Sequence, residues 1–181
     1  MTQFDELHKA LFGNPAPIRP QSSGLAGFLR TTQPQPKPLV KFAKPKVFVS
    51  FDYDNDVHYK RLLEAWSANS RFQFTFHDKT PQEIQSNDIG RIKAVLTTKV
   101  QEASHVLVLV GKHANQQHVD SFRIGCKSWI HFECQQAILY KKKIVAVHLE
   151  PNNELPTILN GIEGQEVFGF SQEYIMKALS K

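Results

Sequence analysis

Cysteine is scarce in this sequence, and long apolar segments are missing. Only two cysteines, Cys126 and Cys134, occur in 181 residues. Without a CxxC pair or a cluster of histidines and cysteines, they support neither a disulfide framework nor a metal site. No apolar run approaches the roughly 18 to 20 residues that span a bilayer, and the N-terminus lacks the basic-then-apolar order of a signal peptide. We therefore expect a cytoplasmic protein with reduced thiols, no bound metal and no membrane partner.

Two phosphate-binding motifs are also missing. Neither GxGxxG nor GxxxxGK[ST] occurs in the chain. A standard dinucleotide-binding fold and a phosphate-loop NTPase are therefore disfavoured. If the chain binds a nucleotide, other residues must hold it.

Positive charge is in excess but is mostly scattered. The net charge is +5 and the isoelectric point is near 9.2. The one lysine run, 141–143, falls where a helix is expected to end, and cations there complement the helix dipole. Because no nucleic-acid-binding motif accompanies the charge, we do not expect a nucleic-acid partner.

Proline is concentrated at one end of the chain. Seven of the ten prolines lie within residues 1–45. This composition predicts a flexible Pro/Gln-rich linker over 14–45. Before it, apolar residues at helical spacing from Phe4 to Phe12 predict a short amphipathic helix over 1–13. Such a helix could dock on the chain's own domain, on a neighbouring subunit or on another protein, and the pattern does not choose among these.

From residue 46 to residue 181, apolar runs alternate with helical patterns. The expected strands span 47–51, 72–76, 105–110 and 144–149. The expected helices span 58–69, 88–103, a stretch around 129–133, and 171–179. Strands separated by helices predict a doubly wound parallel α/β sheet with helices on both faces. Ligands of such sheets bind outside the carboxyl ends of the strands, which is where polar residues such as those of 52–56, 77–80 and 111–113 collect in this sequence.

One helical stretch carries an aromatic residue and a carboxylate four residues apart. Trp129 and Glu133 precede the strand expected at 144–149. On a helix, positions i and i+4 share a face, so both side chains are expected to look into one crevice, which suits a sugar and its base.

These patterns together resemble a known family. Its likeness rests on Val47–Phe51, Phe74-x-Phe76-x-Asp78, Ser104–Gly111, Trp129-x-x-x-Glu133 and Lys143–Leu149. In this order the segments resemble the TIR-like domain family, whose best-known members are the TIR proteins of the bacterial Thoeris anti-phage system. The resemblance covers about residues 46–180 and implies a flavodoxin-like TIR fold.

The resemblance also implies an activity. TIR enzymes of this type cleave the nicotinamide glycosidic bond of NAD, and Thoeris members convert the ADP-ribose moiety into a cyclic or related signal nucleotide. By position, Glu133 is the implied catalytic residue, because a carboxylate can hold the ribose hydroxyls and oppose the positive charge that develops on the ribose. NAD is then a substrate and no further cofactor is expected. The implied partners are a downstream effector that responds to the product and further copies of the chain, through TIR surfaces.

Six further residues are candidates for substrate binding. They are Phe51, Asp52, His77, Asp78, Lys112 and Trp129. Structural interpretations stand beside these: Asp52 could cap a helix, Trp129 could belong to the core, and a hydrogen-bonded loop could account for His77 and Asp78.

The loop 112–126 is longer than the resemblance leads us to expect. It contains His113, His118 and Arg123, so we expect it to alter the pocket or a partner's approach. Two non-enzymatic alternatives also remain. One is a TIR scaffold that assembles through its helices and loops, and the other is a domain that binds a nucleotide without cleaving it.

Overall fold

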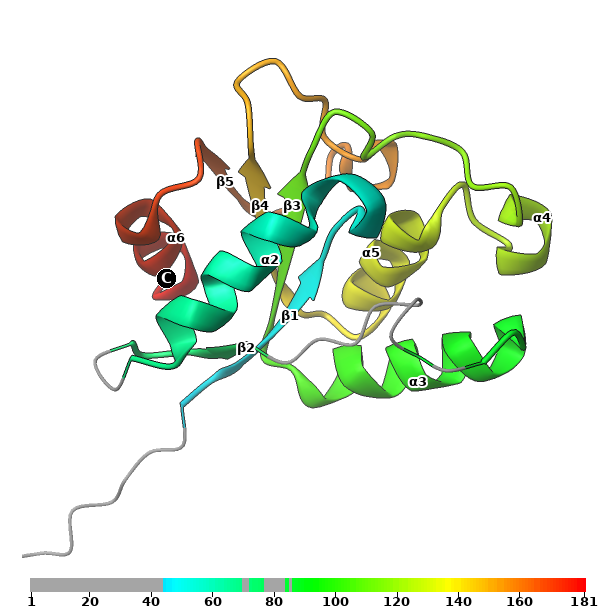
Figure 1. Ribbon diagram of the computed structural model, residues 1–181, viewed down its shortest axis with the longest axis horizontal. Helices are drawn as coiled ribbons and strands as arrows, with labels where there is room; N and C mark the ends of the chain where they lie inside the picture. Colours follow the sequence, from blue (N-terminus) through cyan, green and yellow to red (C-terminus); the bar gives the residue numbers. More distant parts are fainter. Residues whose placement is uncertain (1–43, 70–71, 77–83, 85) are drawn as a thin grey trace, which may run out of the picture. The chain divides into compact units, whose positions relative to one another are not determined.

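The computed structural model describes residues 44–69, 72–76, 84 and 86–181 (Figure 1). The helix expected over 1–13 and almost all of the linker expected over 14–45 lie outside the described residues, as do His77 and Asp78. Among the described residues, none of the helices combines the length and the apolarity that crossing a bilayer requires.

A parallel sheet organises the described residues. Its strands are β1 (Lys46–Ser50), β2 (Thr75–Phe76), β3 (His105–Val110), β4 (Lys143–His148) and β5 (Gln165–Phe168). They lie in the order β2-β1-β3-β4-β5, and every pair is parallel. The chain therefore winds outward from β1 in both directions, as in flavodoxin-like folds. The predicted doubly wound parallel sheet is confirmed.

Helices cover both faces of this sheet. They are α2 (Tyr53–Ser67), α3 (Ile89–Glu102), α4 (Ser121–Ile124), α5 (Trp129–Leu139) and α6 (Gln172–Leu179), with a short 3-10 helix η2 (Thr157–Leu159). In Figure 1, α2 and α6 lie on one side of the sheet and α3 and α5 on the other, while the segment with α4 extends away from the sheet.

Alternation along the strands explains the two layers of core. In β3, Val106 and Val108 pack in the cluster that contains the buried residues of α3 and α5, whereas Leu107 and Leu109 pack with α2 and α6. All six residues of β3 are buried. A central parallel strand covered on both faces has this uninterrupted apolar sequence, which is why its bounds could be predicted from the sequence.

Polar side chains fix where the helices begin. Asp88 caps α3, since its Oδ1 accepts hydrogen bonds from the backbone N–H groups of Gly90 at 2.8 Å and Arg91 at 3.3 Å. Asp52 caps α2 in the same way through the N–H of Asp54, at 3.1 Å. The structure thus bears out the helix-cap interpretation of Asp52.

Two predicted elements need correction, and one strand was missed. The helix expected over 58–69 begins five residues earlier, at Tyr53, because Asp52 caps the first turn of α2 there. The strand expected over 72–76 pairs only at Thr75–Phe76. The strand β5 was not predicted, because only Val167 of its four residues is buried and an edge strand of this kind lacks an apolar pattern.

Candidate functional site

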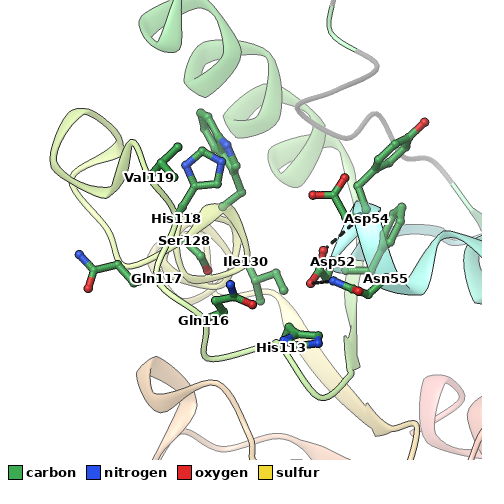
Figure 2. Close-up of a pocket in the computed structure, with 13 residues that line it drawn as sticks. Asp52, Asp54, Asn55, His113, Gln116, Gln117, His118, Val119, Ser128 and Ile130 are labelled. Carbon is green, nitrogen blue, oxygen red and sulfur yellow. Dashed lines mark hydrogen bonds between the residues drawn. The ribbon is translucent and has the colours of Figure 1, made fainter.

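A cavity of about 350 Å³ opens at the carboxyl end of the sheet. It lies between the start of α2, the loop that follows β3 and the start of α5. Figure 2 shows Asp52, Asp54 and Asn55 on one side and Gln117, His118 and Val119 on the other. The lining residues are Phe51, Asp52, Tyr53, Asp54, Asn55, His113, Gln116, Gln117, His118, Val119, Ser128, Trp129 and Ile130.

Acidic and aromatic side chains characterise the lining. Asp52 and Asp54 contribute carboxylates, while Phe51, Tyr53 and Trp129 contribute rings. Neither lysine nor arginine occurs among the lining residues that the structure describes. Such a cavity suits a planar cation, which gains from aromatic faces and from nearby negative charge.

Hydrogen bonds hold the acidic side of the cavity. The Oδ2 atom of Asp52 accepts from the side-chain amide of Asn55 at 2.7 Å, and its Oδ1 accepts from the N–H of Asp54 (Figure 2). Asp52 therefore both begins α2 and sets the position of its neighbours in the cavity wall.

Trp129 is the first residue of α5 and lines two cavities. Its ring meets those of His118 and Phe132 edge-on, with ring centroids at 6.3 Å and 6.1 Å. It lines the first cavity and also a second one, of about 340 Å³. The other residues around the second cavity are Ser86, Asn87, Ile89, Ile92, Asp120 and Arg123.

A buried histidine braces the start of α5. His131 is 4% exposed, and its Nδ1 and Nε2 atoms lie 2.9 Å from Ser128 Oγ and 3.1 Å from Thr157 Oγ1. Burial, and secondarily the charge of Lys127, lower the pKa of His131 below its usual value. The neutral ring therefore bridges the cavity residue Ser128 to η2.

The loop after β3 is tied to the same place. The backbone N–H of Thr157 donates to Asn115 Oδ1 at 2.9 Å, and the Asn115 amide donates to the carbonyl of Leu155 at 3.0 Å. Hydrogen bonds thus join the loop after β3, the start of α5 and η2 beside the cavity, although these segments are distant in sequence.

A buried carboxylate lies one helical turn beyond Trp129. Glu133 is 3% exposed, and Ser50, at the end of β1, donates its hydroxyl hydrogen to Glu133 Oε2 at 2.5 Å. Ser50 itself is 0% exposed and precedes the lining residue Phe51. The pair therefore stands behind the cavity wall and belongs to the same end of the sheet.

Comparison with known proteins assigns this arrangement to a family. The family model described as "Thoeris protein ThsB, TIR-like domain" matches residues 48–154, which is more than half of the chain. The chain belongs to the ThsB TIR-like family. Among solved structures, a prokaryotic SEFIR domain is similar at 17% identity with a TM-score of 0.46, over 75% of this chain and 94% of that one. None of the curated proteins matches the chain.

The structure brings some predicted residues of this TIR-like domain together and leaves others apart. Phe51, Asp52 and Trp129 line the cavity. Glu133 shares a helix face with Trp129 but is absent from the lining that the structure describes. Lys112 is exposed, and the neighbouring His113 lines the cavity in its place.

Two residues at or beside the candidate site received no role in the sequence-based prediction. Ser50 closes an apolar strand, and a buried hydroxyl at a strand's carboxyl end was the only signal for it. His118 was noticed in the long loop but received no role, although it contacts Trp129. Cys134 is fully buried, and burial, followed by the charge of Glu133, raises the pKa of its thiol.

Proposed function

We propose that this TIR-like domain cleaves the glycosidic bond between nicotinamide and ribose in NAD, and that it does so as part of anti-phage signalling. Membership of the ThsB family supports the choice of substrate and the defence role. The observation that carries the proposal is the carboxylate of Glu133, held by Ser50 directly behind an acidic, aromatic cavity.

The cavity fits one half of the substrate by its charge. Nicotinamide in NAD is a planar pyridinium cation, and the lining offers the ring of Trp129 together with the carboxylates of Asp52 and Asp54. Attraction between a cation and these groups is strongest where water is excluded. The phosphates of NAD would be repelled by the same carboxylates, so we place the nicotinamide end in the cavity.

The reaction requires little proton transfer. The bond from the ribose anomeric carbon to the ring nitrogen breaks, and its electron pair stays on nicotinamide, which leaves as a neutral molecule. The ribose develops oxocarbenium character, which the carboxylate of Glu133 opposes. Water then adds and gives up a proton to the solvent, which yields ADP-ribose, or a nucleophile of the ADP-ribose itself adds to give a cyclic product.

Glu133 must reach the ribose for this role. It lies one turn further along α5 than the lining residues Trp129 and Ile130, and its bond to Ser50 holds it beside Phe51. We therefore propose that substrate binding displaces the wall formed by Phe51 and Ile130 and exposes the carboxylate.

The test is nicotinamide release from NAD by the purified full-length chain, followed by chromatography of the products. Glu133→Gln, which keeps the volume and can still accept from Ser50, should abolish release and leave the unfolding midpoint within a few degrees of the wild type. Glu102→Gln, at an exposed carboxylate of α3, serves as the matched control and should release nicotinamide at the wild-type rate. Equal release by the Glu133→Gln variant and the wild type would refute the assignment of Glu133.

A second measurement tests whether the protein cleaves NAD only after a phage-derived trigger. NAD content is followed in bacteria that express the wild type or Glu133→Gln, before and after phage challenge. The proposal expects NAD to fall after challenge in wild-type cells alone, together with the appearance of an ADP-ribose-derived nucleotide.

One observation favours an alternative, a domain that binds a nucleotide without cleaving it. Glu133 is 3% exposed and is not part of the described cavity lining. On this alternative, calorimetry would show NAD binding to wild type and Glu133→Gln with equal affinity, while no nicotinamide is released in either assay.

A further inference from the structure

The backbone of His118 is held beside the start of α5. Its N–H donates to the carbonyl of Lys127 at 2.8 Å, and its carbonyl accepts from the N–H of Ser121 at 3.0 Å. The long loop after β3 thus folds back on itself at this residue. His118 therefore occupies a defined place in the cavity wall, although it lies on a loop (Figure 2).

A backbone hydrogen bond also sets the tautomer of the ring. The N–H of Asp120 donates to Nδ1 of His118 at 3.0 Å. A neutral imidazole whose Nδ1 accepts a hydrogen bond carries its hydrogen on Nε2. His118 consequently offers the cavity an Nε2–H donor.

Three side-chain donors of the lining already have acceptors. The amide of Asn55 donates to Asp52, and that of Gln117 donates to Ser121 Oγ at 2.9 Å. The hydroxyl of Ser128 is shared with the ring of His131 at 2.9 Å. His118 differs from these in that the nitrogen fixed by the loop is the acceptor, so its donor remains for a ligand.

The position relative to Trp129 decides which part of a ligand this donor meets. The two rings are inclined by 70° with centroids 6.3 Å apart. Since both rings also line the cavity, a flat ring stacked on the indole could bring a substituent near the imidazole. On nicotinamide, that substituent is a carboxamide with a carbonyl oxygen that accepts hydrogen bonds.

We propose that His118 determines specificity in this cavity by donating its Nε2–H to the carboxamide oxygen of nicotinamide stacked on Trp129. This inference rests on the proposed function, which places the nicotinamide half of NAD in the cavity. It adds the residue that recognises the leaving group and the feature of the leaving group that is recognised.

The experiment compares NAD with analogues that differ only in the ring substituent. The 3-acetylpyridine analogue keeps the carbonyl oxygen, and the unsubstituted pyridine analogue lacks it. One neutral hydrogen bond of about 1.4 kcal/mol corresponds to a tenfold difference in affinity. Pyridine is also the poorer leaving group, because it lacks the electron-withdrawing carbonyl, so the readout is the change in preference between proteins. The preference in kcat/KM for NAD and the acetylpyridine analogue over the pyridine analogue should be about tenfold larger in the wild type than in a protein that lacks the hydrogen bond.

Substitutions test whether His118 is the residue responsible for that preference. His118→Ala should lose this tenfold contribution and keep only the preference that the leaving-group ability of the rings sets. His118→Gln, whose amide nitrogen lies near the place of Nε2, should restore part of the preference, whereas His118→Asn should not. His58→Ala, at an exposed histidine of α2 outside the cavity lining, is the control and should keep the full preference. An unchanged preference in His118→Ala overturns the inference.

A binding readout separates this inference from the proposed function. Free nicotinamide and free pyridine are titrated into the full-length Glu133→Gln protein and followed by NMR. If nicotinamide binds more tightly than pyridine, and if this difference is lost when His118→Ala is combined with Glu133→Gln, the inference is supported even where NAD turnover is absent. Equal binding of the two rings, or a difference that survives His118→Ala, refutes the inference even where Glu133-dependent turnover is found.

Discussion

Gly111 lies so close to the side-chain carboxyl of Asp56 that a single methyl group added at residue 111 is expected to clash with it. A Cβ atom added at Gly111 would lie 2.1 Å from Asp56 Oδ2 and 2.7 Å from Asp56 Cγ. Asp56 is 7% exposed in the first turns of α2, so its carboxyl has little room to rotate away. Overpacking of this kind costs ~1–3 kcal/mol. We expect Gly111→Ala to lower the free energy of unfolding by that amount.

A double-mutant cycle identifies the carboxyl as the cause. Asp56→Ala removes the group that the new methyl would meet, so Asp56→Ala combined with Gly111→Ala should be more stable than the sum of the single changes predicts. The coupling should reach ~1 kcal/mol or more, measured by urea unfolding at pH 7.5. Strictly additive effects would refute the reasoning, because they would mean that the methyl and the carboxyl never meet.

The carboxyl of Asp56 also makes the free energy of unfolding depend on pH. Burial, and then the charge of Asp52, raise the pKa of Asp56 from 3.8 to about 6, while His58 and His113 act in the opposite direction. Because the pKa is raised in the folded state, the folded chain holds the proton more tightly. Its contribution to stability is full below pH 3.8 and is lost as the pH rises through about 6.

Asp56→Asn removes this dependence. A rise from 3.8 to about 6 corresponds to ~3 kcal/mol at most. Relative to the wild type, the asparagine variant should therefore gain ~1–3 kcal/mol of unfolding free energy between pH 4 and pH 7. Parallel pH profiles for the two proteins would show that the carboxyl is not desolvated as the structure implies.

Three further predictions concern other side-chain contacts. Ser50→Ala deprives Glu133 of a hydroxyl donor and should lower both nicotinamide release and, by ~1–3 kcal/mol, the unfolding free energy; unchanged values of both would contradict the role of this bond. The pKa of His131 is lowered in the folded state, so the folded chain favours the neutral ring. The contribution of His131 to the free energy of unfolding is therefore full above pH 6.5 and is lost as the pH falls through the folded-state pKa. Urea unfolding at pH 7.5 and pH 5 should show a smaller loss in His131→Asn than in the wild type, and an equal loss would contradict the account. Lys142 donates to two carbonyls at the end of α3, each at 2.7 Å, so Lys142→Met should cost ~1 kcal/mol of stability, measured by thermal unfolding, whereas Lys141→Met, at an exposed neighbour, should cost less.

The sequence predicted much of the fold because the responsible signals are local. The run 105–110 is apolar throughout, so a buried central strand was the evident interpretation, and β3 has those bounds. The apolar spacing over 88–103 predicted a helix there, and α3 spans Ile89–Glu102 with Asp88 as its cap. By contrast, β5 was missed because an edge strand buries one residue in four and leaves no pattern to detect.

For the candidate site, the sequence by itself supplied the chemistry, and the tertiary structure decided the neighbours. The spacing of Trp129 and Glu133 on one helix face could be derived from the period of the helix alone. That Glu133 bonds Ser50, 83 positions away, depends on the packing of α5 against β1. The contact of His118 with Trp129 depends on how the loop 112–127 folds back. Local periodicity determines which residues share a face, but side chains that are distant in sequence meet only through the packing of the whole sheet and its helices.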